Sequence, residues 1–418
     1  PGIDLDLPLV GLDGETDADI DASAREHLQS FLTAPFDLEQ GPIWRTQLLR
    51  LAPERHWLAI SIHHIASDGW SMALLQTEIA ALYNAQLAGA PSPLTALKVQ
   101  YADFAASQRH WLNTERFQRQ LTYWREHLSH APTLHSLPLD HPRPDEQRFV
   151  GAQLAFSLDA TLTAGLRRVG RVHGTTPFMT LLAGFTALLS RHSEHNDWVI
   201  GTPIANRLHP ELEPLIGFFV NTLVLRTDLS GNPTFRKLLK RVRETALDAY
   251  AHQDLPFEQL VQELQPERSP GFNPLFQVMF VFQNIPQYEL QLSGLEAETV
   301  LVPRATSKFD LMLSLEEKND EILGTFEYSI DLFESAMIAR MIDHFQILVD
   351  GILANPQQRI GVLQLLTDNE RHQLLELWND TQNNYPRERC IHELFEQQVK
   401  HTPDGVAIRY KSLHLTYR

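Results

Sequence analysis

Residues 58–71 read "LAISIHHIASDGWS". Larger apolar side chains alternate with smaller ones up to a pair of histidines, which predicts a strand that ends near His64. If the face that carries the isoleucines is the buried one, His64 points inward at the mouth of a core or cleft. Asp68-Gly69 is a turn dipeptide, and a helical pattern begins just beyond it.

A histidine at such a strand end allows three interpretations. A neutral imidazole beside a turn and a helix N-terminus is well placed for general-base chemistry near neutral pH. A half-buried, hydrogen-bonded core histidine is the structural alternative. A metal site on His64 and Asp68 is the third, although the spacing implies no third ligand and His63 should face away from His64 on a strand. No serine elbow, phosphate-binding glycine loop or partnered cysteine nucleophile competes, which favours a histidine-centred, non-covalent mechanism.

The composition is that of a large globular protein. The 418 residues are 43% hydrophobic and 21% charged, which is enough for two or three cores. The formal charge of −17 argues against nucleic acid or an anionic membrane as a partner. Because Cys390 is the only cysteine, we expect no disulfide, no thiolate metal cluster and a reducing cytoplasm. The longest apolar run, from Phe178, is too short for a membrane span and predicts a buried helix.

Helical and strand-like segments alternate along most of the chain, which predicts an α/β or α+β fold. Neighbouring strands are expected at 45–51 and 56–64, a helix at 71–87, and one long helix at 101–128. The prolines of 131–144 mark the best internal boundary. Further elements are expected beyond it, with helices around 162–173, 177–192, 234–253 and 334–353, and strands around 197–205, 218–229, 276–284, 308–320 and 321–331.

The run "IHHIASDGWS" resembles the HHxxxDG signature of the condensation domains of nonribosomal peptide synthetases. Other blocks similar to this family follow in the expected order, namely "YADFAASQ" (101–108), "IGFFVNTLVLR" (216–226), "HQDLPFE" (252–258) and "ERSPGFNPLFQVMF" (267–280). "PFDLEQGPIWR" (35–45) resembles the segment that precedes the signature. The resemblance covers roughly residues 1–360, and the tail from residue 379 resembles the opening of an adenylation domain.

The resemblance implies a two-lobed, V-shaped α/β (α+β) fold similar to chloramphenicol acetyltransferase, with a central tunnel. Residues 1–140 would form the N-terminal lobe, incomplete at its start, and 141–360 the C-terminal lobe. Residues 361–385 would be a linker, and 386–418 the truncated beginning of an adenylation domain.

The function that the resemblance implies is amide-bond formation in nonribosomal peptide synthesis. An acyl or peptidyl group would pass from an upstream carrier-protein thioester to the amine of an aminoacyl thioester on the downstream carrier protein. The partners would be these two peptidyl carrier proteins and the adjacent adenylation domain. Substrates would arrive as phosphopantetheine thioesters, and the domain would bind no cofactor and no metal of its own.

The resemblance also assigns roles to the signature. His64 would be catalytic, mainly by positioning the attacking amine and stabilising the tetrahedral intermediate, with proton transfer as a lesser contribution. Gly69 would offer a backbone N–H to the developing oxyanion. His63 and Trp70 would support the active-site loop, and Asp68 would hold it through an ion pair.

In the later blocks, structure is expected to outweigh chemistry. "FFVNT" (218–222) should build the strand that crosses between the lobes, with Asn221 holding backbone on the tunnel side. "HQDLPFE" should be a packed turn after a helix.

The chain departs from the family at its front. It opens on Pro1, and two early blocks of the family are absent, one of them of the type RHxxLR, which carries the arginine that pairs with the aspartate of the signature. Asp68 is therefore expected to lack its partner, and an unpaired buried carboxylate takes up a proton or draws in water. We accordingly expect the 418-residue chain alone to be poorly stable and inactive, so that the function is that of a parent protein.

Related domains supply the alternatives. Epimerization domains share HHxxxDG but usually continue with another pattern than Trp-Ser, and an adenylation domain does not normally follow them. Heterocyclization domains replace the histidines by aspartate-type residues. A dual epimerization and condensation domain stays open, because its extra histidine motif would lie in the missing front. An alternative of another class is a non-catalytic carrier-protein docking module, but such modules tend to lose the histidine signature.

Overall fold

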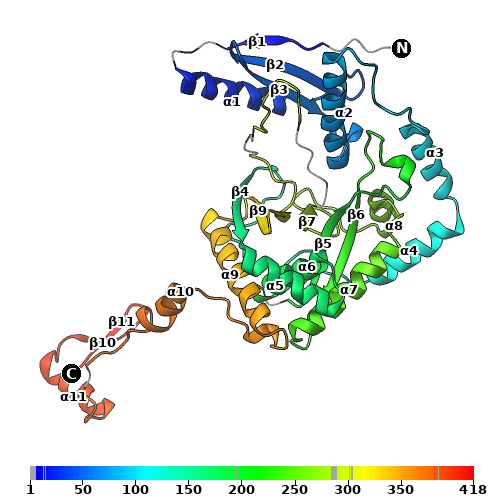
Figure 1. The fold of residues 1–418 in the computed structure, drawn as a ribbon. Coiled ribbons are helices and arrows are strands. Elements are labelled where there is room, and N and C mark those ends of the chain that lie inside the picture. The colour runs from blue at the N-terminus through cyan, green and yellow to red at the C-terminus, as the bar shows by residue number, and fades with distance from the viewer. Residues whose placement is uncertain are drawn as a thin grey trace. The chain divides into compact units, whose positions relative to one another are not determined.

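The computed structural model describes residues 6–12, 14, 16–193, 195–283, 290–300, 302, 305–384 and 386–418. The chain forms two compact units, Pro1–Leu365 and Leu366–Arg418. The larger unit mixes helices with two separate sheets, each of which has its own hydrophobic core (Figure 1). These two sheets define the two lobes of the larger unit.

The N-terminal lobe has a small sheet in the order β1-β2-β3, with β1 parallel and β3 antiparallel to β2. Helix α1 packs on it, and Thr16 caps that helix by accepting a hydrogen bond from the Asp19 N–H at 3.2 Å. Helix α2 follows β3. The elements are β1 (Leu9–Gly11), α1 (Asp17–Thr33), β2 (Trp44–Ala52), β3 (Arg55–Ile62) and α2 (Gly69–Leu87).

The buried face of β3 is the opposite of the one expected. Ala59 and Ser61 are buried, whereas Leu58 on the isoleucine face is 47% exposed. The prediction that the isoleucine face lies inward is therefore wrong. The reason is α1, which packs against the small side chain of Ala59 through Ala24 and Leu28.

The long helix expected at 101–128 is two helices, α3 (Tyr101–Trp111) and α4 (Glu115–His127). The break occurs because Thr114 caps a new helix, with its hydroxyl oxygen accepting from the Phe117 N–H at 3.4 Å. Phe117 and Trp124 of α4 are buried in the core of the second lobe. The chain therefore enters the core of the second lobe before residue 140. The domain division at 140 stays a prediction.

The C-terminal lobe is built on a six-stranded mixed sheet in the order β4-β9-β8-β7-β5-β6, in which β7 is parallel to both β5 and β8. Four long helices, α5, α6, α7 and α9, pack against one another and on the sheet (Figure 1). The strands are β4 (Gly151–Leu158), β5 (Asp197–Ile204), β6 (Asn221–Asp228), β7 (Val278–Gln283), β8 (Leu311–Lys318) and β9 (Glu321–Ser329). The helices are α5 (Ala160–His173), α6 (Pro177–Arg191), α7 (Phe235–Ala251), α8 (Phe257–Leu264) and α9 (Ser335–Ala354).

Helix α6 confirms the buried helix expected from Phe178 onward, since Phe185 and Leu188 are fully buried. Among the described residues, no single helix is long and apolar enough to cross a membrane. By length and composition alone, α5 and α6 together pass that test as a pair bent by 106°.

The second unit contains α10 (Asp368–His372), a π-helical turn (Gln373–Leu377), α11 (Ile391–His401) and a hairpin of β10 (Val406–Tyr410) and β11 (Leu413–Thr416). None of its described residues is buried. Cys390 is exposed at the start of α11. Leu363 still lies in the core of the first unit. The adenylation-domain start within this second unit remains a prediction.

Candidate active site

Both signature histidines lie just after β3, on a short turn. The strand ends at Ile62, the His63 N–H donates to the Ile43 carbonyl at 2.8 Å, and one 3-10 turn follows at His64–Ala66. His63 supports this turn, because its Nδ1 accepts from the Ile65 N–H at 3.1 Å. His64 is exposed. The turn takes both residues out of the strand, so strand alternation does not set the direction of His64. Its place at the mouth of a cleft stays a prediction.

The His64 imidazole is held in one orientation. Its Nδ1 lies 2.6 Å from the Ser67 carbonyl oxygen. A carbonyl oxygen only accepts, so Nδ1 carries a proton, and in the neutral imidazole Nε2 then has the lone pair. The edge-to-face contact with Phe218, at 5.1 Å between ring centroids and 86° between planes, supports the same orientation. Nε2 is thus the atom that can accept a hydrogen bond or a proton.

Asp68 caps helix α2 and is 4% exposed. One carboxylate oxygen accepts from the Ser71 N–H at 2.8 Å and lies 2.8 Å from the Ser71 hydroxyl. An acceptor at this position satisfies a backbone donor of the first helical turn, which fixes where the helix begins. The cap therefore determines how the loop of His64 joins α2.

Asp68 also has a charged partner, Arg207, which follows β5 in the other lobe. The two guanidinium contacts are 3.1 and 3.2 Å, and the side chains are 2% and 4% exposed. The prediction of an unpaired Asp68 carboxylate is wrong, although its partner is not an arginine of an RHxxLR block. The partner comes from a segment 139 residues further along the chain, where no motif indicated it. The unpaired carboxylate was the reason to expect an unstable chain, so that expectation loses its physical basis, although it is untested.

Arg207 has further partners within the same junction. It donates to the Ser71 hydroxyl oxygen at 2.9 Å and to the Leu215 carbonyl at 3.1 Å, and its guanidinium lies 4.1 Å from the centroid of the Phe219 ring. Burial lowers the pKa of Arg207, and Asp68 partly offsets this. The guanidinium stays charged at neutral pH, because the ordinary pKa of arginine lies far above neutrality. A buried charge with these partners holds Asp68 and the 215–219 segment together.

Three of the sequence blocks meet at residues 217–219. The Gly217 N–H donates to the Ser71 hydroxyl oxygen at 3.1 Å, and the Phe219 N–H donates to Asp68 at 3.0 Å. The Tyr101 hydroxyl donates to the Phe218 carbonyl at 2.9 Å. Burial, together with the charge of Asp68, raises the pKa of Tyr101, so its hydroxyl keeps the proton that it donates. We call residues 68–71, 101, 207 and 215–219 the lobe junction.

Comparison with known proteins fits this geometry. The model of the condensation-domain family matches residues 6–375. The chain belongs to this family. Domains of the family are acyltransferase-type enzymes that form amide bonds between carrier-bound substrates in nonribosomal peptide synthesis, and they have the two-lobed fold of chloramphenicol acetyltransferase type. The predicted family, fold class and type of activity are thereby confirmed. The V shape and the tunnel stay predictions.

Among relatives, malpibaldin synthetase of Mortierella alpina is 45% identical over 99% of this chain, and a protein of the linear gramicidin synthase of Brevibacillus parabrevis is 45% identical over 96%. The chain spans 8% of the length of each. Among solved structures, the X-domain from teicoplanin biosynthesis in complex with OxyB is 29% identical, with a TM-score of 0.78 over 87% of this chain and 80% of that one.

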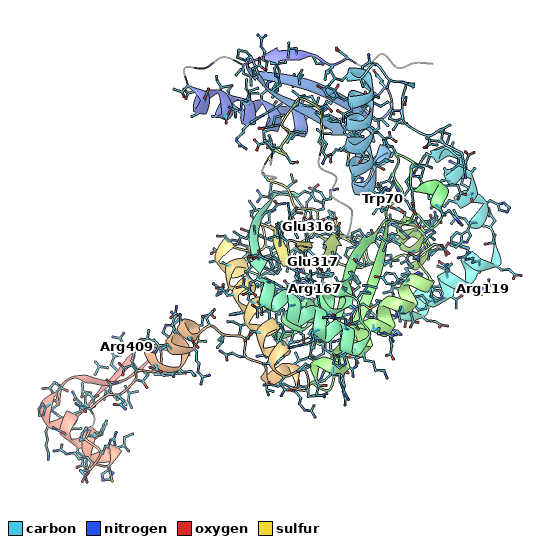
Figure 2. All side chains as sticks on the ribbon, viewed as in Figure 1. Trp70, Arg119, Arg167, Glu316, Glu317 and Arg409 are labelled. Carbon is cyan, nitrogen blue, oxygen red and sulfur yellow. The ribbon has the colours of Figure 1, made fainter. Side chains whose placement is uncertain are left out.

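Gly69 and Trp70 lie on the condensation domain's helix α2. Gly69 is its exposed first residue, and the N–H of a first helical residue has no carbonyl partner within the helix. The indole N–H of the half-buried Trp70 donates to the Glu213 carbonyl at 2.9 Å, which ties this side chain to the second lobe (Figure 2). The oxyanion role of Gly69 stays a prediction.

Asn221 holds backbone, as its assigned role requires. Its amide nitrogen donates to the Gln253 and Leu255 carbonyls at 3.0 and 2.8 Å, and its oxygen accepts from the Phe257 N–H at 2.9 Å. These are the residues of the "HQDLPFE" turn. The expected crossing strand is different, however. β6 starts at Asn221 and stays within the second sheet, and the loop 217–219 before it reaches the first lobe.

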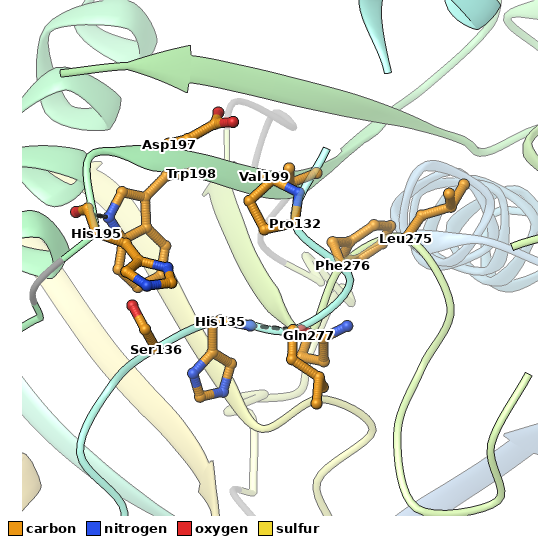
Figure 3. Close-up of a pocket in the computed structure, with 11 residues that line it drawn as sticks. Pro132, His135, Ser136, His195, Asp197, Trp198, Val199, Leu275, Phe276 and Gln277 are labelled. Atoms are coloured by element: carbon orange, nitrogen blue, oxygen red, sulfur yellow. Dashed lines mark hydrogen bonds between the residues drawn. The ribbon is translucent and has the colours of Figure 1, made fainter. Parts of the chain in front are cut away.

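A small cavity lies elsewhere in the condensation domain. It has a volume of about 10 Å³, room for about one water molecule, between residues 132–136, the start of strand β5 and residues 275–277 before β7 (Figure 3). His135, which lines it, is held by Gln277 at its N–H (3.1 Å) and by Asp310 at Nε2 (3.0 Å). This cavity is too small for an aminoacyl group. Across the described residues, no three His, Cys, Asp or Glu side chains gather in a way that could hold a metal ion.

Proposed function

We propose that this condensation domain joins a carrier-bound donor acyl or peptidyl group to the amine of a carrier-bound aminoacyl thioester. The observation that carries the proposal is the His64 imidazole. Its Nδ1 donates to the Ser67 carbonyl at 2.6 Å, and no described residue forms a hydrogen bond with the lone pair of its Nε2, which lies on an exposed turn. The loop that presents it is fixed by a buried Asp68–Arg207 pair.

The chemistry follows from that lone pair. The acceptor amine donates a hydrogen bond to His64 Nε2 and attacks the donor thioester carbon. A C–N bond forms, the C–S bond breaks, and the proton lost by the amine leaves with the thiolate. Orientation supplies much of the rate, because effective molarities of about 10⁵ M or more are attainable for well-placed reactants. The free N–H of Gly69 at the α2 N-terminus is the proposed donor to the oxyanion.

We propose as partners an upstream and a downstream peptidyl carrier protein, and an adenylation domain whose first residues, 386–418, lie in the second unit. The substrates bring their own phosphopantetheine, so the domain needs no cofactor of its own. A cytoplasmic site of action fits the single exposed cysteine. Epimerization is not favoured, because the family match is to a condensation domain.

A docking function is the second candidate, since the similar X-domain was solved in complex with OxyB. The two functions differ in their need for His64. Docking does not require a histidine whose ring is oriented by a loop that a buried ion pair holds in place. Amide formation uses such a histidine. The intact histidine pair therefore favours catalysis.

The test is His64→Ala in the full-length protein to which the chain belongs, with condensed product measured on the downstream carrier. We expect a loss of about 10²-fold or more, the usual contribution of a positioned acid–base group. The matched control is His56→Ala, because His56 is exposed on β3, the strand that leads to His64, and its loss should leave the rate unchanged. Undiminished product from His64→Ala would favour docking over catalysis.

A further inference from the structure

The aromatic ring that contacts the catalytic imidazole comes from the opposite lobe. Phe218 lies in the loop before β6, and its ring meets His64 edge to face at 5.1 Å. His63 has its own aromatic neighbour, Phe36 of the first lobe, at 5.8 Å. Only the histidine with the free Nε2 therefore takes its ring contact across the lobe junction.

Phe218 is held in place from several sides. Its carbonyl accepts from the Tyr101 hydroxyl at 2.9 Å. Its neighbour Gly217 donates to the Ser71 hydroxyl oxygen at 3.1 Å, and its neighbour Phe219 donates to Asp68 at 3.0 Å. Asp68 ends the loop of His64, and Ser71 lies in the first turn of the helix α2 that follows. The loop that presents the imidazole thus also fixes the residue that contacts it.

The imidazole has one soft degree of freedom, the rotation of its ring about the Cβ–Cγ bond. Terminal torsions of this kind have broad, roughly two-fold minima, so a flip would exchange Nδ1 and Nε2 with ring carbons. The Ser67 carbonyl opposes the flip at one ring atom, and the edge-to-face contact with Phe218 opposes tilting of the ring plane. Neither contact touches Nε2, which is left for the substrate.

We infer that Phe218 is a positioning residue that sets the plane of the His64 imidazole. Nε2 of His64 is therefore correctly oriented for the substrate only when the two lobes are in contact. This inference rests on the proposed function for its kinetic consequence. Its structural consequence, a single imidazole tautomer, can be measured without any reaction.

The kinetic test is Phe218→Leu in the full-length protein, which keeps an apolar side chain but removes the ring. At saturating acceptor we expect kcat for condensed product to fall about 2- to 12-fold, the range that corresponds to one aromatic pair, with KM for the acceptor carrier unchanged. Phe218→Tyr keeps the ring and should restore kcat. Equal kcat for Phe218→Leu and the parent, or a change in KM alone, would overturn the inference.

The matched control is Phe104→Leu. Phe104 packs on Phe219 at 4.7 Å and on Tyr101 at 5.8 Å, so its loss loosens the same loop without removing a contact with His64. We expect Phe104→Leu to lower the thermal midpoint at least as much as Phe218→Leu while retaining more of kcat. If the two variants lose kcat in proportion to stability, Phe218 acts through packing alone and the inference fails.

The second measurement is the ¹⁵N NMR spectrum of histidine-labelled 418-residue chain, with His64 assigned from the signal that disappears in His64→Gln. We expect a protonated Nδ1 and a bare Nε2 in the parent chain and in Phe104→Leu, and an averaged signal in Phe218→Leu. A parent chain with the proton on Nε2, or an unaltered signal in Phe218→Leu, would refute the positioning role. If the unsubstituted full-length protein gives no condensed product while the NMR result is as expected, the proposed function is refuted and the positioning role of Phe218 is not.

Discussion

Replacing Arg207 by glutamine tests the lobe junction most directly. The substitution removes the guanidinium contacts to Asp68 at 3.1 and 3.2 Å and leaves a carboxylate that is 4% exposed without its cationic partner. Removing one partner of a buried ion pair costs about 3–5 kcal/mol, because the other charge stays buried and uncompensated. Asp68 keeps its hydrogen bonds from Ser71 and from the Phe219 N–H. We therefore expect the lower end of this range, about 3 kcal/mol.

The assay is urea unfolding of the 418-residue chain, followed by tryptophan fluorescence, with condensation measured in the full-length protein. The control is Arg55→Gln, since Arg55 pairs with Asp21 at the surface, with side chains 44% and 34% exposed, and exposed pairs contribute little. A second variant combines Arg207→Gln with Asp68→Asn, which keeps an N-cap side chain but removes the stranded charge. We expect the double variant to be more stable than Arg207→Gln alone. The reasoning is refuted if Arg207→Gln costs no more than Arg55→Gln, or if the double variant shows the sum of the single losses.

Two further predictions concern burial. Desolvation, reinforced by Arg226, lowers the pKa of His127, so below the unfolded-state value of about 6.5 the unfolded chain binds more protons than the folded one and stability falls as the pH falls. His127→Phe should flatten the loss of unfolding free energy between pH 7 and 5, and an unchanged slope would contradict the assignment. Gly217→Ala would place a Cβ 2.4 Å from the Tyr101 ring, so we expect about 1–3 kcal/mol of destabilisation and a lower condensation rate. Denaturant unfolding checks this, and a parent-like midpoint would show that Tyr101 can move aside freely.

The sequence predicted the chemistry of the site better than its geometry. His64 and Asp68 were found because their spacing is a local signal, fixed by one turn and one helix cap. Arg207 was missed because it lies in a loop, 139 residues from Asp68, and a contact at such a separation produces no pattern in the local sequence. Strand alternation was the wrong basis for the orientation of His64, because the residue lies beyond the strand, in a 3-10 turn that depends on hydrogen bonds to Ile43 and His63.

The same contrast holds for the fold. Strands rich in leucine, valine and phenylalanine, such as β7 and β8, were expected from their composition. β4 was not, because "GAQLAFSL" is rich in small residues that carry little strand propensity. The strand conformation of β4 is stabilised instead by its pairing with β9 over the full length Gly151–Leu158. The buried face of β3 could not be assigned either, because it depends on α1, which is distant in the sequence.

The lobe junction bears on how such proteins can be recombined. Asp68 and Ser71 lie on one side of the proline-rich segment 131–144, and Arg207, Gly217 and Phe219 lie on the other. A chimera with its crossover in that segment would combine the loop with Asp68 from one parent with the partner residues Arg207, Gly217 and Phe219 from another. Such an exchange should succeed when both parents carry a compatible acid–arginine pair, and the pair therefore defines a rule of compatibility between half-domains of different origin.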